Sequence, residues 1–362
     1  MQKSDGMNYA PTGKPQPVVG PGEFPFGVIG LEHGHINGMC NGLREAGAEL
    51  RTVYDPDPAK VAAFRQRFPQ AVAASCEAAV LEDPALRLIA GAAIPADRCA
   101  LGLRVMDHGK DYFCDKAPVT TLTQLAQARS RTLATGRKYM VYYSERLHVE
   151  SAVFAGQLIA AGAIGRVVQV VNLAPHRLNA AGRPAWFWQK ARTGGILVDI
   201  GSHQIEQFLA YTGAKDAKVL NATVANYTCP DHPEFEDFGD ANLLGDNGAT
   251  QYLRVDWLNP AGLRSWGDGR LFLLGTAGYI EVRKYIDVAR SPHGDQVFLV
   301  DGKGEQHFEV AGKVGFPFFG QLIRDCLDRT ETAMTQAHAF KTAELCLRAQ
   351  EQAVRAAVAL PS

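Results

Sequence analysis

The feature that most constrains this chain is a regular alternation of short apolar runs and helical segments between residues 24 and 145. The apolar runs cover residues 25–30, 48–55, 86–95, 110–116 and 138–144. Helix signals stand between them: Pro58 suits the first turn of one segment and Gly109 ends another. Strands that alternate with helices at this spacing form a parallel sheet covered on both faces. We therefore predict a Rossmann-type α/β domain over residues 24–145.

The character of the chain changes after Arg146. A helix over about 149–162 and a long strand over 166–175 come first, and strand-like segments separated by turn residues follow. Such turns are typical of antiparallel sheets. Helices return at about 316–328 and 336–358. This pattern predicts a C-terminal α+β domain, residues 146–362, with a large, mostly antiparallel open sheet.

Residues 1–23 resemble neither domain. They carry Gly and Pro but no apolar core and no paired arginines. We therefore expect a disordered leader and not a signal peptide.

Composition narrows the class of protein. The 362 residues include 37 Lys and Arg against 38 Asp and Glu, so the net charge is −1 and the pI is near 6.8. This balance offers no basic surface for nucleic acid or anionic membranes, and no apolar run reaches membrane-spanning length. The seven cysteines form no C-x-x-C pair, which argues against a zinc site and a disulfide framework. We expect a cytoplasmic protein with no metal, nucleic-acid or membrane partner.

The turn after the first predicted strand reads GLEHGH, residues 30–35. A turn at a helix N-terminus can bind a dinucleotide pyrophosphate through backbone N–H groups. The usual pattern is G-x-G-x-x-G/A, and Glu32 stands in place of the second glycine. A carboxylate there repels phosphate unless its side chain turns away or pairs with a basic group. The residues expected to bind the cofactor from this strand edge are Gly30, Leu31, Glu32, His33 and Pro95.

Asp55 ends the second predicted strand. A carboxylate at this place accepts hydrogen bonds from adenosine ribose hydroxyls and repels a 2′-phosphate, which favours NAD over NADP. The alternative is that Asp55 only caps the turn in YDPDP.

Two further stretches carry groups for proton transfer. In GGILVDIGSHQIEQFL, residues 194–209, Asp199 and His203 stand four residues apart, so a helix beginning near Asp199 would place both side chains on one face. A carboxylate beside an imidazole orients it and raises its pKa. Lys116 follows the fourth predicted strand, at the sheet edge where ligands collect. The alternatives are a helix cap at Asp199, a packing role for His203 and a solvated side chain for Lys116.

These residues make the chain resemble the Gfo/Idh/MocA oxidoreductase family, named for glucose–fructose oxidoreductase and inositol dehydrogenase. The resemblance covers nearly everything from Phe24 to the last helix. The family's GG-x-x-x-D-x-G-x-H is matched by Gly194, Gly195, Asp199, Gly201 and His203, and its E-K-P by Asp115, Lys116 and Ala117, with a proline one place later at Pro118. The chain departs from the family at Glu32, at Ala117, and at Arg98, where many members have histidine.

The resemblance implies a nicotinamide cofactor, usually NAD, and a sugar, polyol or inositol-like alcohol or ketone as substrate. It also implies a homodimer or homotetramer formed through the C-terminal sheet. Lys116 and His203 are the implied catalytic pair. While the cofactor carries the hydride, His203 would take the hydroxyl proton and Lys116 would hydrogen-bond the same oxygen. Asp199 would orient His203 or hold a neighbouring hydroxyl.

Other residues are candidates for the sugar site because aromatic rings pack against sugars while Arg and His bond their hydroxyls. These candidates are His176, Arg177, Trp186 and Trp188, together with Asp199 and His203. The aromatic run 186–188 could equally be ordinary core. Arg146 lies at the predicted domain junction, where it could contact the cofactor or form a structural salt bridge.

Two other functions remain compatible with the resemblance. Some relatives hydrolyse glycosides by transient oxidation with tightly held NAD, and others are non-catalytic NAD-binding regulators. The intact lysine, aspartate and histidine favour an enzyme, because a sensor needs no proton acceptor beside the nicotinamide.

Overall fold

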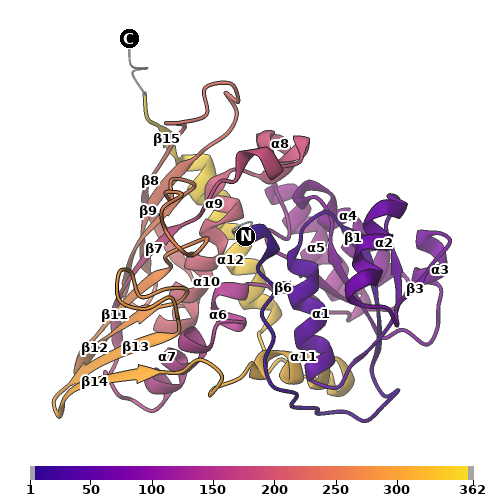
Figure 1. Cartoon of the computed structure of the whole chain (residues 1–362), viewed down its shortest axis with the longest axis horizontal. Coiled ribbons are helices and arrows are strands. Elements are labelled where there is room, and N and C mark those ends of the chain that lie inside the picture. The colour runs from indigo at the N-terminus through magenta and orange to yellow at the C-terminus, as the bar shows by residue number, and fades with distance from the viewer. Residues whose placement is uncertain (1–4, 358–362) are drawn as a thin grey trace. The chain divides into compact units, whose positions relative to one another are not determined.

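The computed structural model describes residues 5–357, which divide into two compact units (Figure 1). Residues 7–142 and 316–340 form the first, which we call the parallel-sheet unit. Residues 5–6, 143–315 and 341–357 form the second, the mixed-sheet unit. Among the described residues, no helix has both the length and the apolar character needed to span a membrane.

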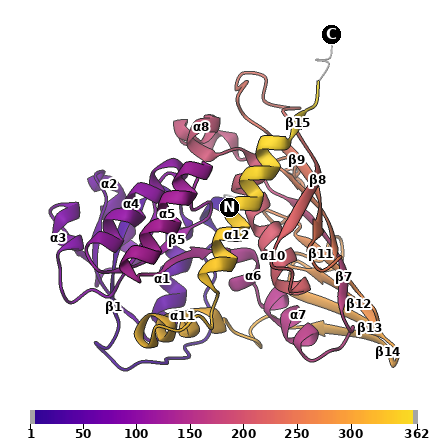
Figure 2. The same cartoon turned by 180° about the vertical axis from the view of Figure 1, so that it is seen from behind.

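The parallel-sheet unit is built on six strands in the order β3-β2-β1-β4-β5-β6, and all neighbouring strands are parallel. The strands are β1 (Pro25–Leu31), β2 (Glu49–Tyr54), β3 (Val72–Ala73), β4 (Leu88–Ala92), β5 (Asp111–Asp115) and β6 (Tyr139–Tyr142). The helices are α1 (His35–Glu45), α2 (Pro58–Arg67), α3 (Glu77–Leu81), α4 (Pro95–Asp107), α5 (Leu122–Thr135) and α11 (Pro317–Asp328). Figure 2 shows α4 and α5 packed beside each other. This strand order is that of a Rossmann fold, so the predicted α/β fold is confirmed.

Local signals account for the helix ends in this unit. The Asp57 side chain accepts a hydrogen bond from the Ala59 N–H at 2.9 Å, and Pro58 occupies the first turn of α2. Thr121 caps α5, and Gly136 ends it with a φ of 64°. Strands β4 and β5 bury every side chain, as strands covered on both faces must.

Residues 7–23 belong to the parallel-sheet unit and do not form the predicted disordered leader. The Gln16 N–H donates to the Glu45 carbonyl at 2.9 Å, and the Gly13 N–H donates to the Glu45 carboxylate, also at 2.9 Å. The segment lacks apolar periodicity because it is held by the end of α1 and not by a core face of its own. Residues 1–4 of the predicted leader lie outside the described residues.

The mixed-sheet unit is built on nine strands in the order β14-β13-β12-β11-β7-β10-β9-β8-β15. The strands are β7 (Val167–Pro175), β8 (Ala217–Ala225), β9 (Phe238–Gly245), β10 (Thr250–Asp256), β11 (Arg270–Gly275), β12 (Gly278–Arg283), β13 (Gln296–Asp301), β14 (Gly304–Glu309) and β15 (Val354–Arg355). Only the β7–β10 and β8–β15 pairs among them are parallel. The predicted α+β architecture with a large, mostly antiparallel sheet is therefore confirmed.

The helices of the mixed-sheet unit are α6 (Ser144–Leu147), α7 (Glu150–Ala160), α8 (Lys190–Thr193), α9 (Ile196–Asp199), α10 (Gly201–Thr212) and α12 (Gln336–Gln352), of which residues 336–340 belong to the other unit. Short 3₁₀ turns are η1 (Gly6–Asn8), η2 (Ala180–Gly182) and η3 (Ala185–Trp188). Helices α7 and α10 pack on one face of the sheet, α7 against β12 and β13 and α10 against β7 and β10 (Figure 1).

The boundary between the units differs from the predicted division at 145/146. The chain leaves the parallel-sheet unit after Tyr142, and residues 316–340 return to it. Phe318 and Phe319 of α11 pack on Phe113 of β5, with ring centroids 5.9 and 6.3 Å apart. The apolar pattern of α11 predicts a buried face, but it does not indicate which sheet that face covers.

The last helix also ends earlier than predicted. It stops at Gln352, and Val354–Arg355 pair in parallel with Thr223–Val224 of β8 as an added edge strand. The end of the predicted helix, residue 358, lies outside the described residues.

Candidate functional site

The turn between β1 and α1 is shaped for close backbone approach. Gly30 has a φ of +88°, and a Cβ there would lie 3.0 Å from the backbone nitrogen of Ala93. Gly34 is the N-cap of α1, and no acidic side chain stands in the first turn of that helix. A helix N-terminus without an acidic side chain favours an anion, so this turn fits a pyrophosphate.

Asp55 follows β2 and is 5% exposed. Its Oδ2 accepts a hydrogen bond from the Leu31 N–H at 2.7 Å, and its Oδ1 accepts one from the Asp57 N–H at 2.9 Å. The carboxylate therefore caps the turn, as one reading of the sequence proposed. Each oxygen still has a second lone pair, so capping leaves room for hydrogen bonds from ribose hydroxyls.

Glu32 points toward α2, where its carboxylate forms an ion pair with the Lys60 ammonium. The sequence allowed either a side chain aimed at the phosphates or one paired with a basic group, and the structure has the second. Its negative charge is therefore compensated inside the protein.

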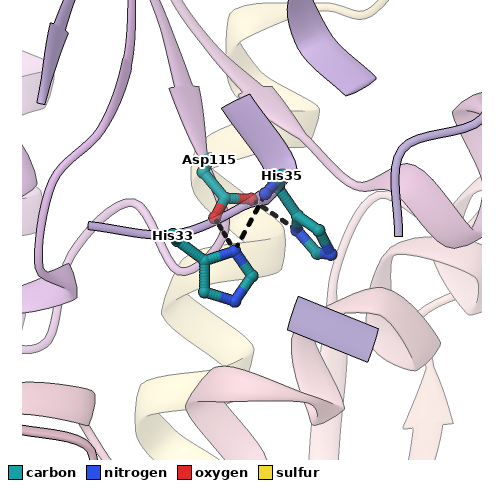
Figure 3. A group of neighbouring side chains, drawn as sticks. All are labelled: His33, His35 and Asp115. Atoms are coloured by element: carbon teal, nitrogen blue, oxygen red, sulfur yellow. Dashed lines mark hydrogen bonds and ion pairs between the residues drawn. The ribbon is translucent and has the colours of Figure 1, made fainter. Parts of the chain in front are cut away.

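Asp115 gathers two histidines at the end of β5. Figure 3 shows both rings directed at its carboxylate. The His33 Nδ1 lies 3.1 Å from Asp115 Oδ2, and the His35 Nδ1 lies 3.0 Å from Oδ1. Burial, followed by the charge of His35, lowers the pKa of His33 from 6.5 to about 3, so that imidazole is neutral at pH 7. Burial alone would raise the pKa of Asp115, but His35, Arg98 and His33 outweigh it and hold that pKa well below its usual range.

Arg98 fixes the backbone around Lys116. Its guanidinium is fully buried and donates to Asp115 Oδ2 at 3.1 Å, to the Ala117 carbonyl at 3.1 Å and to the Lys116 carbonyl. The Lys116 N–H in turn donates to Asp115 Oδ1 at 2.8 Å. Lys116 itself is 5% exposed, and its peptide bond to Ala117 is cis. Arg98, where the chain departs from the family pattern, therefore holds in place the backbone of the segment that carries the candidate catalytic Lys116.

His33, His35 and Asp115 each offer one ligand atom, and these atoms lie within 4.8 Å of one another, as a metal site requires. Arg98 already binds this carboxylate, and the charge of Lys116 is near enough to lower the pKa of His33. Two cations beside one carboxylate oppose a further divalent cation. The arrangement is better explained as the hydrogen-bonded support of the strand end that carries Lys116.

In the mixed-sheet unit, Asp199 and His203 lie on two consecutive helices and not on the one predicted helix. Asp199 ends α9, and His203 lies in the first turn of α10. Ile200 between them keeps right-handed helical angles, φ −81° and ψ −45°, so the helical path continues. His203 is 3% exposed, and its N–H donates to the Ile200 carbonyl at 3.0 Å. The two glycines before α9, Gly194 and Gly195, have φ values of 87° and 92°.

The aromatic candidates divide between site and core. Phe187 is 5% exposed and packs among Trp188, Phe235 and Trp257, which supports the core alternative for this part of the run. Trp188 stacks on His232, with ring centroids 3.9 Å apart, and a small cavity is lined by Trp188, Asp199 and also Phe187. Trp186 contacts Phe187 at 6.3 Å and does not line that cavity.

His176 and Arg177 have different surroundings although they are neighbours. The His176 ring packs between Trp257 and Trp266, and its Nε2 lies 3.8 Å from Glu145 Oε1. Arg177 donates to the carbonyls of Leu263 and Ser265 at 2.6 and 2.8 Å, which holds a loop.

A buried polar network, missed by the sequence analysis, surrounds Glu145. The Lys284 ammonium donates to Glu145 Oε2 at 2.7 Å and to Gln207 Oε1 at 2.9 Å. Burial alone would raise the pKa of Glu145, but Lys284, His203 and His176 outweigh it and lower that pKa. Other buried members are Asn172, Gln204 and Gln251. Glu145 precedes the candidate Arg146 in the sequence, but its partner Lys284 is remote in sequence and belongs to no motif. The sequence therefore could not indicate the network.

Arg146 forms an ion pair with the fully buried Glu206, with Nε 2.8 Å from both carboxylate oxygens. This is the structural salt bridge that the sequence allowed. The Arg146 side chain is 23% exposed, and the alternative role, contact with the cofactor, stays a prediction.

Known proteins with the same architecture are numerous. The family model of the GFO/IDH/MocA C-terminal domain matches residues 153–281. A crystal structure of a protein assigned as an oxidoreductase from Erwinia carotovora atroseptica SCRI1043 is 52% identical, with a TM-score of 0.90 over 92% of this chain and 100% of that chain. Levoglucosan dehydrogenase, in complex with NADH and levoglucosan, is 16% identical, with a TM-score of 0.74 over 91% of this chain and 97% of that one.

An oxidoreductase from Agrobacterium radiobacter, in complex with NAD⁺, L-tartaric acid and magnesium, is 17% identical, with a TM-score of 0.76 over 91% of this chain and 96% of that one. No curated protein matches the chain in sequence. The two distant structures share the fold, whereas the Erwinia protein shares half of its residues along nearly the whole of both chains. Together with the C-terminal domain match and the two motifs, this shows that the chain belongs to the Gfo/Idh/MocA family of oxidoreductases.

Proposed function

We propose that this protein transfers a hydride between NAD and a CH–OH group of a sugar, polyol or inositol-like substrate. The observation that carries the proposal is the intact set of proton-handling groups, with Lys116 fixed at the end of β5 and Asp199 and His203 at the α9–α10 turn. Fold relatives support the same chemistry, because one of them binds NADH together with levoglucosan.

The residues of the parallel-sheet unit fit a nicotinamide dinucleotide. The turn from Gly30 to Gly34 and the N-terminus of α1 would hold the pyrophosphate through the backbone of Leu31, Glu32 and His33, while the Glu32 carboxylate stays paired with Lys60. Pro95 begins α4 at the same strand edge. Asp55 would bond the adenosine ribose and disfavour NADP. When bound, the nicotinamide supplies the hydride chemistry.

The protein's own groups would manage the proton and the oxygen. In oxidation, a neutral His203 accepts the hydroxyl proton through an imidazole nitrogen, a step typically worth about 10²–10⁴-fold in rate. The Lys116 ammonium donates a hydrogen bond to the same oxygen and stabilises its developing negative charge. Asp199 orients the histidine or holds a neighbouring hydroxyl. In reduction, His203 returns the proton.

The substrate would be a polyhydroxylated compound. Trp188 and Asp199 both line one small cavity, so an apolar ring and a hydrogen-bond acceptor lie close together there. His176 and His203 lie within electrostatic reach of the same buried carboxylate, Glu145. Arg177 and Trp186 remain candidates at the margin of this region.

A panel of sugars, polyols and inositols with NAD⁺, read as the absorbance of NADH, tests the proposal. We expect one class to be oxidised by the wild-type protein and not by His203→Asn. Release of phenol from an aryl glycoside without net NADH would favour the glycosidase alternative. Binding of NAD⁺ without turnover of either class would favour a regulator.

We also propose a cytoplasmic homodimer or homotetramer. All seven cysteines are free thiols, which suits a reducing compartment. The strands of the mixed sheet expose apolar side chains, namely Leu220, Leu244, Leu274 and Tyr279. Such side chains on an open sheet suit contact with a second copy. Light scattering coupled to gel filtration would measure the mass, and a monomer at micromolar concentration would contradict the proposal.

A further inference from the structure

Glu32 and Lys60 form their ion pair close to the end of β2. Lys60 lies in the first turn of α2, which begins directly after Asp55 and Asp57. The side chains of Glu32 and Lys60 are 22% and 34% exposed. The side chain of Lys60 is therefore partly exposed at this strand edge.

The charges around Lys60 are mostly negative. Burial by itself would lower its pKa, but the hydrogen bond that Lys60 donates to Glu32 and the charges of Glu32, Asp55 and Asp57 outweigh it and raise that pKa. The Lys60 ammonium is thus charged, and Glu32 already balances its charge. Without Glu32, the negative charges that raise its pKa would be those of Asp55 and Asp57.

A Rossmann fold places the adenosine ribose beside the carboxylate that ends β2, here Asp55. A dinucleotide with a 2′-phosphate brings its additional negative charge to this position, and a nearby cation is what accommodates it. Lys60 is a cation at this strand edge that could pair with such a phosphate, but its ammonium is already paired with Glu32.

We propose that Glu32 is a cofactor-specificity residue, which keeps Lys60 engaged and so withholds it from a 2′-phosphate. The inference rests on the proposed NAD-dependent function. It gives a role to the carboxylate that replaces the second glycine of the turn. Asp55 repels the phosphate directly, whereas Glu32 acts by occupying the cation that would attract it.

The test is a calorimetric titration of NAD⁺ and NADP⁺ into the wild-type protein, Glu32→Gln, Lys60→Met and the double variant. Glu32→Gln should tighten NADP⁺ binding about tenfold, because Lys60 then bonds the phosphate, and should change NAD⁺ binding less than about twofold. Lys60→Met in the Glu32→Gln protein should abolish the gain. Glu32→Gly, which restores the family's glycine, should give the same gain if the glutamine variant folds poorly.

A second arm uses Asp55→Ser. Alone, this change leaves Lys60 paired with Glu32, so its gain in NADP⁺ affinity should be smaller than that of Asp55→Ser with Glu32→Gln. The gains should be non-additive, because both carboxylates act on one phosphate and one lysine.

The matched control is Glu77→Gln. It breaks an ion pair with Arg104 elsewhere in the same unit, where the side chains are 30% and 48% exposed, and removes the same charge. Equal gains in NADP⁺ affinity from Glu77→Gln and Glu32→Gln would overturn the proposal, since net charge alone would explain them. If the wild-type protein binds NAD⁺ but Glu32→Gln does not gain NADP⁺ affinity, the proposal fails and the proposed function stands. A wild-type protein that binds neither dinucleotide overturns both.

Discussion

Arg98 stands where the resemblance to the family led us to expect histidine, and the two side chains differ in the number of hydrogen bonds they can donate. A guanidinium offers five N–H donors in a fixed plane, whereas an imidazole offers two at most. Arg98 uses them on Asp115 and on the carbonyls of Lys116 and Ala117. Ala117 follows Lys116 where the family motif has proline, and the Arg98 side chain holds this part of the backbone through the carbonyls of both residues.

We expect Arg98→Met to destabilise the protein by about 3–5 kcal/mol, because it removes the guanidinium that pairs with the buried Asp115 carboxylate and donates to two backbone carbonyls. Urea unfolding followed by circular dichroism would measure this. Arg98→Lys should recover part of the loss, since it restores charge but not the planar donor set. A loss below about 1 kcal/mol for Arg98→Met would contradict the role assigned to this residue.

His203→Asn should reduce kcat for oxidation by about 10²–10⁴-fold while the affinity for NAD⁺ changes little, because the imidazole acts on the substrate proton. In the wild-type enzyme, kcat/KM should fall at low pH as the His203 imidazole of the substrate-free enzyme protonates. Lys116→Met should also lower kcat, and the double variant should be non-additive because both groups act on one oxygen. Near-normal turnover of His203→Asn, with a deuterated substrate showing that hydride transfer limits the rate, would rule out this mechanism.

At the scale of elements, the turn before α9 depends on glycine. Gly195 has a φ of +92°, and a Cβ there would lie 2.5 Å from the side chain of Gln350 in α12. Gly195→Ala should therefore cost roughly 1–3 kcal/mol of stability and displace the start of α9. Gly262→Ala, where nothing lies within 4 Å of an added Cβ, is the control. The expectation fails if both variants unfold at the same urea concentration as the wild-type protein.

Most elements were predictable because their signals are local. The five apolar runs became β1, β2, β4, β5 and β6, and Pro58 lies in the first turn of α2 as the sequence indicated. Elements with remote partners were not predictable: the N-terminal segment bonds to α1, β15 pairs with β8, and α11 packs on β5.

The same limit applies to the site. Motifs singled out Lys116, Asp199 and His203 as candidates, and the YDPDP turn predicted the capping role that Asp55 has in the structure. The ion pairs of Glu32 with Lys60 and of Glu145 with Lys284 could not be predicted, because a charged residue carries no record of its partner's position.

At the scale of the whole molecule, buried titratable groups tie stability to pH. The folded pKa of His33 lies near 3 against an ordinary value of 6.5, so between these values the unfolded chain binds a proton that the folded chain does not. The free energy of unfolding should therefore fall as pH falls through this window, by up to about 1.4 kcal/mol per pH unit from His33 alone. Asp115, whose folded pKa is lower than its unfolded one, contributes stability that is lost at still more acid pH.

Urea unfolding across this pH window would measure the slope. His33→Gln should flatten it, whereas His293→Gln, at an exposed position, should leave it unchanged. An identical slope in the wild-type protein and in His33→Gln would show that other groups dominate.

The return of residues 316–340 to the parallel-sheet unit has a consequence for how the chain is made. A ribosome delivers β5 and β6 early, but the aromatic side chains of α11 that cover Phe113 are synthesised only after all the strands from β7 to β14. During translation the face of β5 that α11 covers therefore stays exposed. A fragment that ends at Tyr142 keeps this apolar face open, and we expect such a fragment to bind chaperones and to precipitate unless residues 316–340 are supplied with it.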